Sequence, residues 1–185
     1  LFRSTLFRSH STKPVLPQWP EDVQVVFAGR AARGSTGFVE WLRARAAALG
    51  VADRLRITGY LSEEALNRYL AATDLALCPF ETISASGSLA TWIAAERPIL
   101  ASEQPQIAEY NAMAPGAIAT FSPYTSHALA EAARAALERD DAAGRRARAR
   151  LRAMLSLARV IRQHADAYRR AADPDLNVPT APSSE

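Results

Sequence analysis

The sequence predicts an α/β fold, with a Rossmann-like parallel sheet that carries helices on both faces. Short apolar runs rich in β-branched residues recur along the chain, and segments with helical patterning separate them. Strands and helices that alternate in this way form parallel sheets, because each helix carries the chain back to the starting edge. The 185 residues suffice for one domain of ordinary size with appendages.

Each of the first two predicted strands leads into a helix. Residues 23–29 read Val-Gln-Val-Val-Phe-Ala-Gly, which is typical of a buried parallel strand. The helix that follows is expected to end at Gly50, a residue type favoured just after a helix. The second strand covers residues 54–60, and Ser62 is placed to cap the next helix.

Three more strands complete the expected sheet, at residues 75–80, 98–101 and 117–121, with a helix over residues 87–95 after the first of them. Cys78 is the single cysteine and lies in the apolar run of the third strand. A small buried core residue is the favoured interpretation there, rather than a reactive thiol.

From residue 126 onward the sequence predicts helices, the last of them a single long C-terminal helix with one apolar stripe. That stripe needs a surface to dock on, either this domain or another lobe. The Pro/Ser/Thr-rich end of the chain predicts disorder. The expected organisation is an irregular N-terminal segment over residues 1–20, a Rossmann-like domain over 21–140, the C-terminal helix over 141–172 and a disordered tail over 173–185.

Positive charge is concentrated near the C-terminus, where eleven arginines lie between Arg134 and Arg170 against four acidic residues. A basic helix can contact nucleic acid or anionic lipid, and a solvated helix face is the alternative. No aromatic residues interleave with the arginines as stacking platforms, so no nucleic acid partner is expected. No apolar run approaches the ~20 residues of a membrane span. We expect a cytoplasmic protein, at most peripheral to the inner face of an anionic membrane.

The loop after the third strand is the most informative part of the sequence, because ligands bind at the carboxyl ends of parallel strands. It runs from Glu81 to Ser88 as Glu-Thr-Ile-Ser-Ala-Ser-Gly-Ser and leads into a helix. Free amides at a helix N-terminus favour a phosphate, Gly87 lets the backbone approach it, and serine hydroxyls can donate. Ordinary N-capping by Ser84 or Ser86 remains the alternative.

The order of segments resembles the C-terminal domain of glycosyltransferase family 4 and its GT-B relatives, over residues 23–172. The resemblance rests on four stretches taken together. They are Leu-Gly-Val-Ala-Asp-Arg-Leu at residues 49–55, the strand end Gly59-Tyr60, Ala-Ala-Thr-Asp at residues 71–74 and Arg-Pro-Ile-Leu-Ala-Ser at residues 97–102.

The resemblance implies the donor-binding half of an enzyme that transfers a sugar from a nucleotide-diphospho-sugar to an acceptor, usually with retention of configuration. It implies a nucleotide-sugar donor as partner and no cofactor. No metal is expected, because the three histidines are far apart and have no cysteine pairs beside them. The N-terminal acceptor lobe of the family is not in this sequence. We expect the same or a separate chain to supply it, and the isolated chain to be inactive.

Relatives stabilise the diphosphate leaving group with an Arg and a Lys a few residues apart, since cations placed where charge develops lower the barrier. Arg8 and Lys13 fit that spacing, although they could equally be surface residues. Tyr60 occupies a turn that meets the nucleotide base in relatives, with a packed turn aromatic as the alternative.

The sequence departs from the family at two glutamates that contact the sugar and the ribose. Their positions align with Ile83 and Thr91, and neither is acidic. Glu81 could reach the sugar along a different loop path, and the Ser-x-Ser-Gly loop found in some relatives is present. A degenerate lobe that serves as a non-catalytic interaction module, or half of a nucleotide-sugar epimerase, remains possible. No catalytic residue is assigned, and the candidate donor-binding residues are Arg8, Lys13, Tyr60, Glu81, Ser84, Ser86, Gly87 and Ser88.

Overall fold

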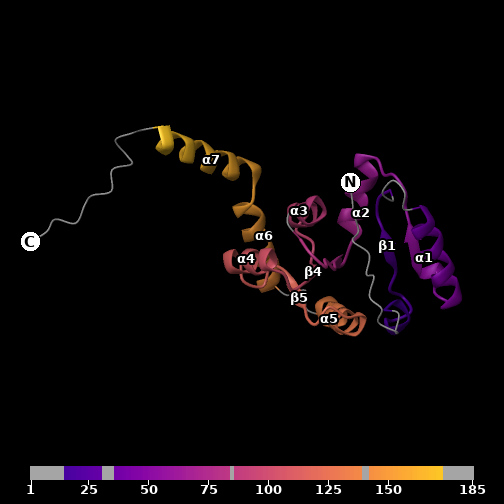
Figure 1. Ribbon diagram of the computed structural model, residues 1–185. Helices are drawn as coiled ribbons and strands as arrows, with labels where there is room; N and C mark the ends of the chain where they lie inside the picture. The colour runs from indigo at the N-terminus through magenta and orange to yellow at the C-terminus, as the bar shows by residue number, and fades with distance from the viewer. Residues whose placement is uncertain (1–14, 31–35, 84–85, 139–141, 173–185) are drawn as a thin grey trace, which may run out of the picture.

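The computed structural model describes residues 15–30, 36–83, 86–138 and 142–172. Parallel strands alternate with helices along these residues, which confirms the predicted fold class (Figure 1). The strands are β1 (Val25–Phe27), β2 (Leu55–Ile57), β3 (Ala76–Cys78), β4 (Ile99–Ser102) and β5 (Ala119–Phe121). The helices are α1 (Thr36–Ala48), α2 (Glu63–Ala72), α3 (Gly87–Ala94), α4 (Pro105–Met113), α5 (Ser126–Glu138), α6 (Ala142–Met154) and α7 (Leu157–Ala172), with short 3-10 helices η1 (Leu16–Gln18) and η2 (Ala52–Arg54).

The five strands form two parallel sheets within the described residues, β1-β2 and β3-β4-β5, where the sequence suggested one. Val25 of β1 pairs with Leu55 of β2, and Leu77 of β3 pairs with Leu100 of β4. Val25 and Leu77 pack against the same hydrophobic cluster. The edge of β1 therefore lies toward β3, while no ladder of hydrogen bonds joins these two strands.

Both faces of the larger sheet are buried, because successive side chains of a strand point to opposite faces. Ala76 and Cys78 of β3 belong to a cluster that includes residues of α3, α4 and α6. Leu77, between them, packs with Leu100 in a second cluster that α5 covers. This arrangement confirms the prediction of helices on both faces, and Cys78 is the buried core residue that the sequence suggested.

The end of the N-terminal segment is more ordered than predicted. Its prolines suggested an irregular chain, but Pro17 lies inside η1, where the fixed φ of proline is compatible with a helical turn. Trp19 follows and is only 8% exposed, with its indole Nε1 donating to the carbonyl of Ala130 in α5 at 3.1 Å. Arg54 also holds this segment, because its guanidinium donates to the carbonyl of Pro20 at 2.6 Å.

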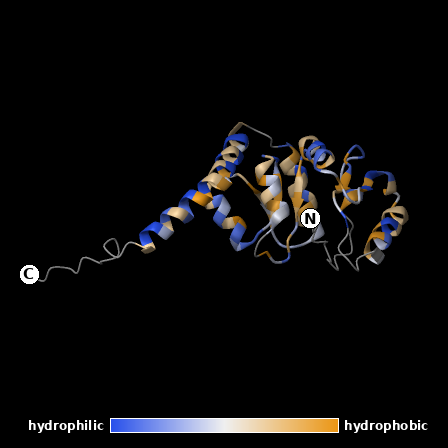
Figure 2. Cartoon of the chain, turned by 90° about the horizontal axis from the view of Figure 1, so that it is seen from above, coloured by the Kyte–Doolittle hydropathy of each residue, from blue (hydrophilic) through white to orange (hydrophobic). Residues whose placement is uncertain are grey.

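The single helix expected over residues 141–172 is wrong, because the chain forms two helices, α6 and α7, with a break near Ser156. The Ser156 hydroxyl donates to the carbonyl of Ala153 at 3.0 Å, and such local bonds compete with helix continuation. Leu151 of α6 is buried in the core. In contrast, α7 has no buried residue and extends away from the sheets (Figures 1 and 2).

Candidate functional site

Polar side chains from neighbouring strands hold the loop that follows β3. Ser102, at the end of β4, donates its hydroxyl hydrogen to the carbonyl of Phe80. The Gln104 amide donates to the carbonyl of Glu81 at 3.2 Å. The Tyr124 hydroxyl, beyond β5, donates to the carbonyl of Pro79 at 2.9 Å. The carboxyl ends of three strands thus fix the chain on its way into α3.

The first turn of α3 is built around two serines. Ser86 is the N-cap, and its Oγ accepts a hydrogen bond from the amide of Leu89 at 3.2 Å. The Oγ atoms of Ser86 and Ser88 lie 2.9 Å apart. Either hydroxyl can be the donor of that bond, but the pair has two hydrogens and uses one between them. Among the described residues, the other hydroxyl hydrogen has no acceptor and can donate to a ligand.

The backbone of this turn also faces open space. Among the described residues, none accepts a hydrogen bond from the amides of Gly87 and Ser88, as is normal for the first positions of a helix. A Cβ added to Gly87 would meet no atom within 4 Å. An anion could therefore approach these two amides, where the helix dipole favours negative charge.

Glu81 lies at the same end of the sheet and is exposed. Burial raises the pKa of Tyr124, and the negative charge of Glu81 raises it further. The charge of Glu81 thus favours the protonated hydroxyl of Tyr124, which holds the chain before this loop. Tyr124 also stacks on Phe121, with ring centroids 6.1 Å apart.

The other candidate residues are less closely associated with this turn. Tyr60 follows β2 in the smaller sheet and is 81% exposed, so it is not a packed turn aromatic. Arg8, Lys13 and Ser84 lie outside the described residues.

The two positions that align with the family glutamates have structural roles instead. Ile83 packs against the core cluster under α3. The hydroxyl of Thr91 donates to the carbonyl of Gly87 at 2.8 Å, one helical turn back. Neither side chain supplies a carboxylate, so the site differs in its chemistry from that of the glutamate-bearing relatives.

Sequence reasoning missed Ser102, Gln104 and Tyr124. The sequence did contain a hint for the first two, because polar residues that end a buried strand lie at the ligand-binding edge of a parallel sheet. Tyr124 had no comparable pattern, since its contact with Pro79 joins residues 45 positions apart.

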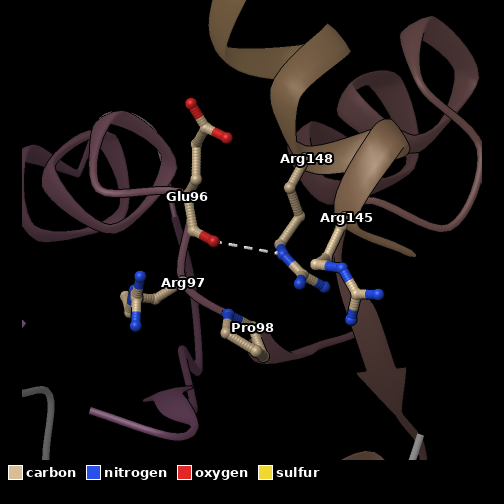
Figure 3. Close-up of a pocket in the computed structure, with 5 residues that line it drawn as sticks. All are labelled: Glu96, Arg97, Pro98, Arg145 and Arg148. Carbon is tan, nitrogen blue, oxygen red and sulfur yellow. Dashed lines mark hydrogen bonds between the residues drawn. The ribbon is translucent and has the colours of Figure 1, made fainter. Parts of the chain in front are cut away.

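A separate pocket of about 200 Å³ lies at the opposite end of α3, lined by Glu96, Arg97, Pro98, Arg145 and Arg148 (Figure 3). Arg148 donates through Nε to the carbonyl of Glu96 at 3.1 Å, and Arg152 pairs with the Glu96 carboxylate. The guanidinium of Arg97 points away from the other two arginines of the pocket and donates to the carbonyl of Ala71 at 3.1 Å. These contacts join α6 to the end of α3, away from the ligand-binding edge.

The described ranges lack two general features. No group of three or more His, Cys, Asp or Glu side chains there is arranged to hold a metal ion. None of the helices that the structure describes is long and apolar enough to cross a membrane.

Several solved structures share the fold of this chain. HepE from Anabaena, in complex with UDP and glucose, superposes with a TM-score of 0.71 at 19% identity, over 84% of this chain and 42% of that one. Sucrose-phosphate synthase from Thermosynechococcus elongatus superposes with a TM-score of 0.63 at 20% identity, over 80% of this chain and 38% of that one. WaaG, a glycosyltransferase involved in lipopolysaccharide biosynthesis, superposes with a TM-score of 0.61 at 22% identity, over 83% of this chain and 41% of that one. The chain thus spans less than half the length of these proteins.

A search of curated proteins found no match to the sequence. Residues 7–139 match the family described as "Glycosyl transferases group 1". This match covers most of the chain and agrees with the GT-B fold seen in the superpositions. The chain therefore belongs to the group 1 glycosyltransferases.

Proposed function

We propose that residues 21–140 are the donor-binding lobe of a glycosyltransferase that takes its sugar from a nucleotide diphosphate. The observation that carries the proposal is the first turn of α3. There, among the described residues, the amides of Gly87 and Ser88 have no acceptor, and the serine pair keeps one hydroxyl hydrogen that is not used between them. This set of donors suits the oxygens of a phosphate.

In this proposal the amides of Gly87 and Ser88 and the serine pair bind the diphosphate, which becomes the leaving group. Negative charge builds on its oxygens as the sugar–phosphate bond breaks, and fixed donors stabilise that charge. Arg8 and Lys13 would add positive charge on the same group. The sugar would then be transferred with retention of its anomeric configuration.

Glu81 and Tyr60 have supporting roles in the proposal. The exposed carboxylate of Glu81, at the start of the loop that leads into α3, would accept hydrogen bonds from sugar hydroxyls. Tyr60, exposed after β2, would stack on the nucleotide base. Because HepE, a structure of the same fold, was solved with UDP-glucose, uridine donors are the first to test.

A second candidate function is a non-catalytic interaction module that has kept the fold. Ile83 and Thr91 favour it, because they stand where relatives have carboxylates and are occupied by packing and by a helix hydrogen bond. The Ser-x-Ser-Gly loop at residues 84–87 argues against it, because some donor-binding relatives carry the same loop.

The proposal is tested by titrating the ¹⁵N-labelled chain with UDP, GDP, ADP and UDP-glucose. Amide NMR spectra monitor the binding of each ligand. We expect at least one nucleotide diphosphate to shift the amide signals of Gly87 and Ser88 more than those elsewhere. Glu131→Gln, on the exposed part of α5, serves as a matched surface control that should bind equally well. No shift with any of the four ligands at millimolar concentration would reject the proposal in favour of the interaction module.

A further inference from the structure

The pocket at the C-terminal end of α3 brings two arginine side chains together. Arg145 and Arg148 are three residues apart on α6, which places them on the same face of that helix. Both line the pocket, and Figure 3 shows their guanidinium groups extending from α6 in the same direction. Like charges at this spacing repel each other, so an anion bound between them would be favourable.

The carboxylate that lines this pocket is directed elsewhere. Glu96 is the acidic residue of the lining, and its side chain pairs with Arg152. Figure 3 shows that side chain pointing away from Arg145 and Arg148. The carbonyl of Glu96 faces them instead and accepts a hydrogen bond from Nε of Arg148 at 3.1 Å. Positive charge therefore predominates on the α6 side of the pocket.

The helix that supplies the pair is strongly basic. Residues 142–154 contain five arginines and neither Asp nor Glu, and the Asp140 and Asp141 that precede them lie outside the described residues. Arg145 and Arg148 each take part in a further interaction within the chain. A guanidinium carries five N–H donors, so it can bind an anion beside such a contact.

We propose that this pocket binds a dianionic phosphate, either as the free ion or as the phosphate group of a small ester. The planar fork of a guanidinium matches two oxygens of a phosphate, and two such forks meet here. The pocket volume of about 200 Å³ is below the roughly 300 Å³ at which pockets for drug-sized ligands begin, so a small ligand fits it best.

The pocket is separate from the proposed donor site and does not depend on it. Pro98 lines the pocket and directly precedes β4, whereas Ser102 at the other end of β4 holds the loop that leads to the donor site. The strands of this sheet are parallel, so the two sites lie at opposite edges of it.

NMR of the ¹⁵N-labelled 185-residue chain tests the proposal, through the arginine Nε–H signals and the backbone amides. The chain is titrated at constant ionic strength with inorganic phosphate, glycerol 3-phosphate and acetate. We expect phosphate or its ester to shift the signals of Arg145 and Arg148, and acetate, with a single charge, to leave them in place. Tighter binding of glycerol 3-phosphate would identify an ester as the ligand, and tighter binding of phosphate would identify the free ion. No shift with either would reject the proposal.

A pair of double variants separates the pocket from overall charge. Arg145→Gln with Arg148→Gln should weaken phosphate binding at least about tenfold, followed through the amides of Glu96 and Arg97, because two charge-assisted contacts are lost. Arg159→Gln with Arg162→Gln on α7 is the matched control, with the same spacing and the same change of charge. It should bind within about twofold of the unchanged chain. Equal losses from both pairs would overturn the proposal.

Two further variants address folding and the donor site. Arg145→Lys with Arg148→Lys keeps both charges and should retain binding, and thermal unfolding checks that every variant is folded. Ser88→Ala should leave the phosphate-induced shifts of Glu96 and Arg97 unchanged. If Ser88→Ala abolished those shifts, the phosphate would be bound at the first turn of α3 and the effect transmitted along the helix, which would contradict a separate site.

Discussion

The side-chain oxygens of Ser86 and Ser88 lie 2.9 Å apart at the first turn of α3, but the two serines have different structural roles. Ser86 caps the helix by accepting the amide hydrogen of Leu89. Ser88 has no such contact with the backbone of α3 among the described residues, and its role is to share a hydrogen with Ser86. Stability and ligand binding should therefore respond differently to changes at these two positions.

Ser88→Ala should weaken binding of a nucleotide diphosphate about tenfold and leave stability unchanged. A hydrogen bond to a charged group contributes about 1.5–3 kcal/mol, and about 1.4 kcal/mol corresponds to a factor of ten. Isothermal titration calorimetry with UDP measures the affinity, and thermal unfolding measures the stability. Ser88→Thr keeps the hydroxyl and should bind as the unchanged chain does. Equal affinity for Ser88→Ala would contradict the role given to this serine.

Ser86→Ala should lower the free energy of unfolding by about 1 kcal/mol, because it removes the N-cap of α3. Ser86→Asp separates capping from ligand binding. Aspartate is also a good N-cap and keeps the stability, but its charge repels a phosphate at the same turn. Urea unfolding and UDP titration check the two effects, and undiminished UDP binding by Ser86→Asp would mean that the phosphate site lies elsewhere.

The strands could be predicted from the sequence because β3 and β4 are buried on both faces, which leaves continuous apolar runs. The split between the sheets could not be predicted, since hydrophobicity does not say which strand edges meet. Among the described residues, β1-β2 and β3-β4-β5 each form a parallel sheet, and no ladder joins β1 to β3.

Part of the candidate site was also predictable. The Ser/Gly composition of the loop and the helix after it indicated a phosphate site, but not that Ser102 and Gln104 hold the loop. Those contacts form across more than 20 residues and exist only in the folded chain. The break near Ser156 escaped prediction because the helical spacing of apolar residues continues across it.

Glu96→Gly should stabilise the protein by about 0.5–1 kcal/mol. Glu96 follows α3 with a φ of 53°, a left-handed conformation that costs about 1–2 kcal/mol for a residue with a Cβ. The change also removes the partly exposed pair with Arg152, which contributes about 0.2–1 kcal/mol. Urea unfolding measures the balance.

Glu96→Ala is the matched control, because it loses the pair with Arg152 and keeps the backbone strain. It should be less stable than the unchanged chain. If Glu96→Gly proved no more stable than Glu96→Ala, the conformation at this position would not be strained as its φ indicates.

The stability of the protein should fall at alkaline pH through Tyr124. Burial, followed by the charge of Glu81, raises the pKa of Tyr124 in the folded chain. The resulting contribution to stability is complete below the ordinary tyrosine pKa. It is lost as the pH rises from that value through the raised pKa, because the unfolded chain ionises first. Glu81→Gln should lower the Tyr124 pKa toward its ordinary value and reduce this loss.

Tyrosine absorbance is measured as a function of pH for the unchanged chain and for Tyr124→Phe. The difference between the two curves isolates the titration of Tyr124 from those of the other four tyrosines. Urea unfolding across the same pH range gives the change in stability. Because burial is the larger cause, the Tyr124 pKa should remain above its ordinary value in Glu81→Gln. An unchanged Tyr124 titration in that variant would mean that the Glu81 carboxylate does not face this end of the sheet, and its proposed contact with the sugar would lose its basis.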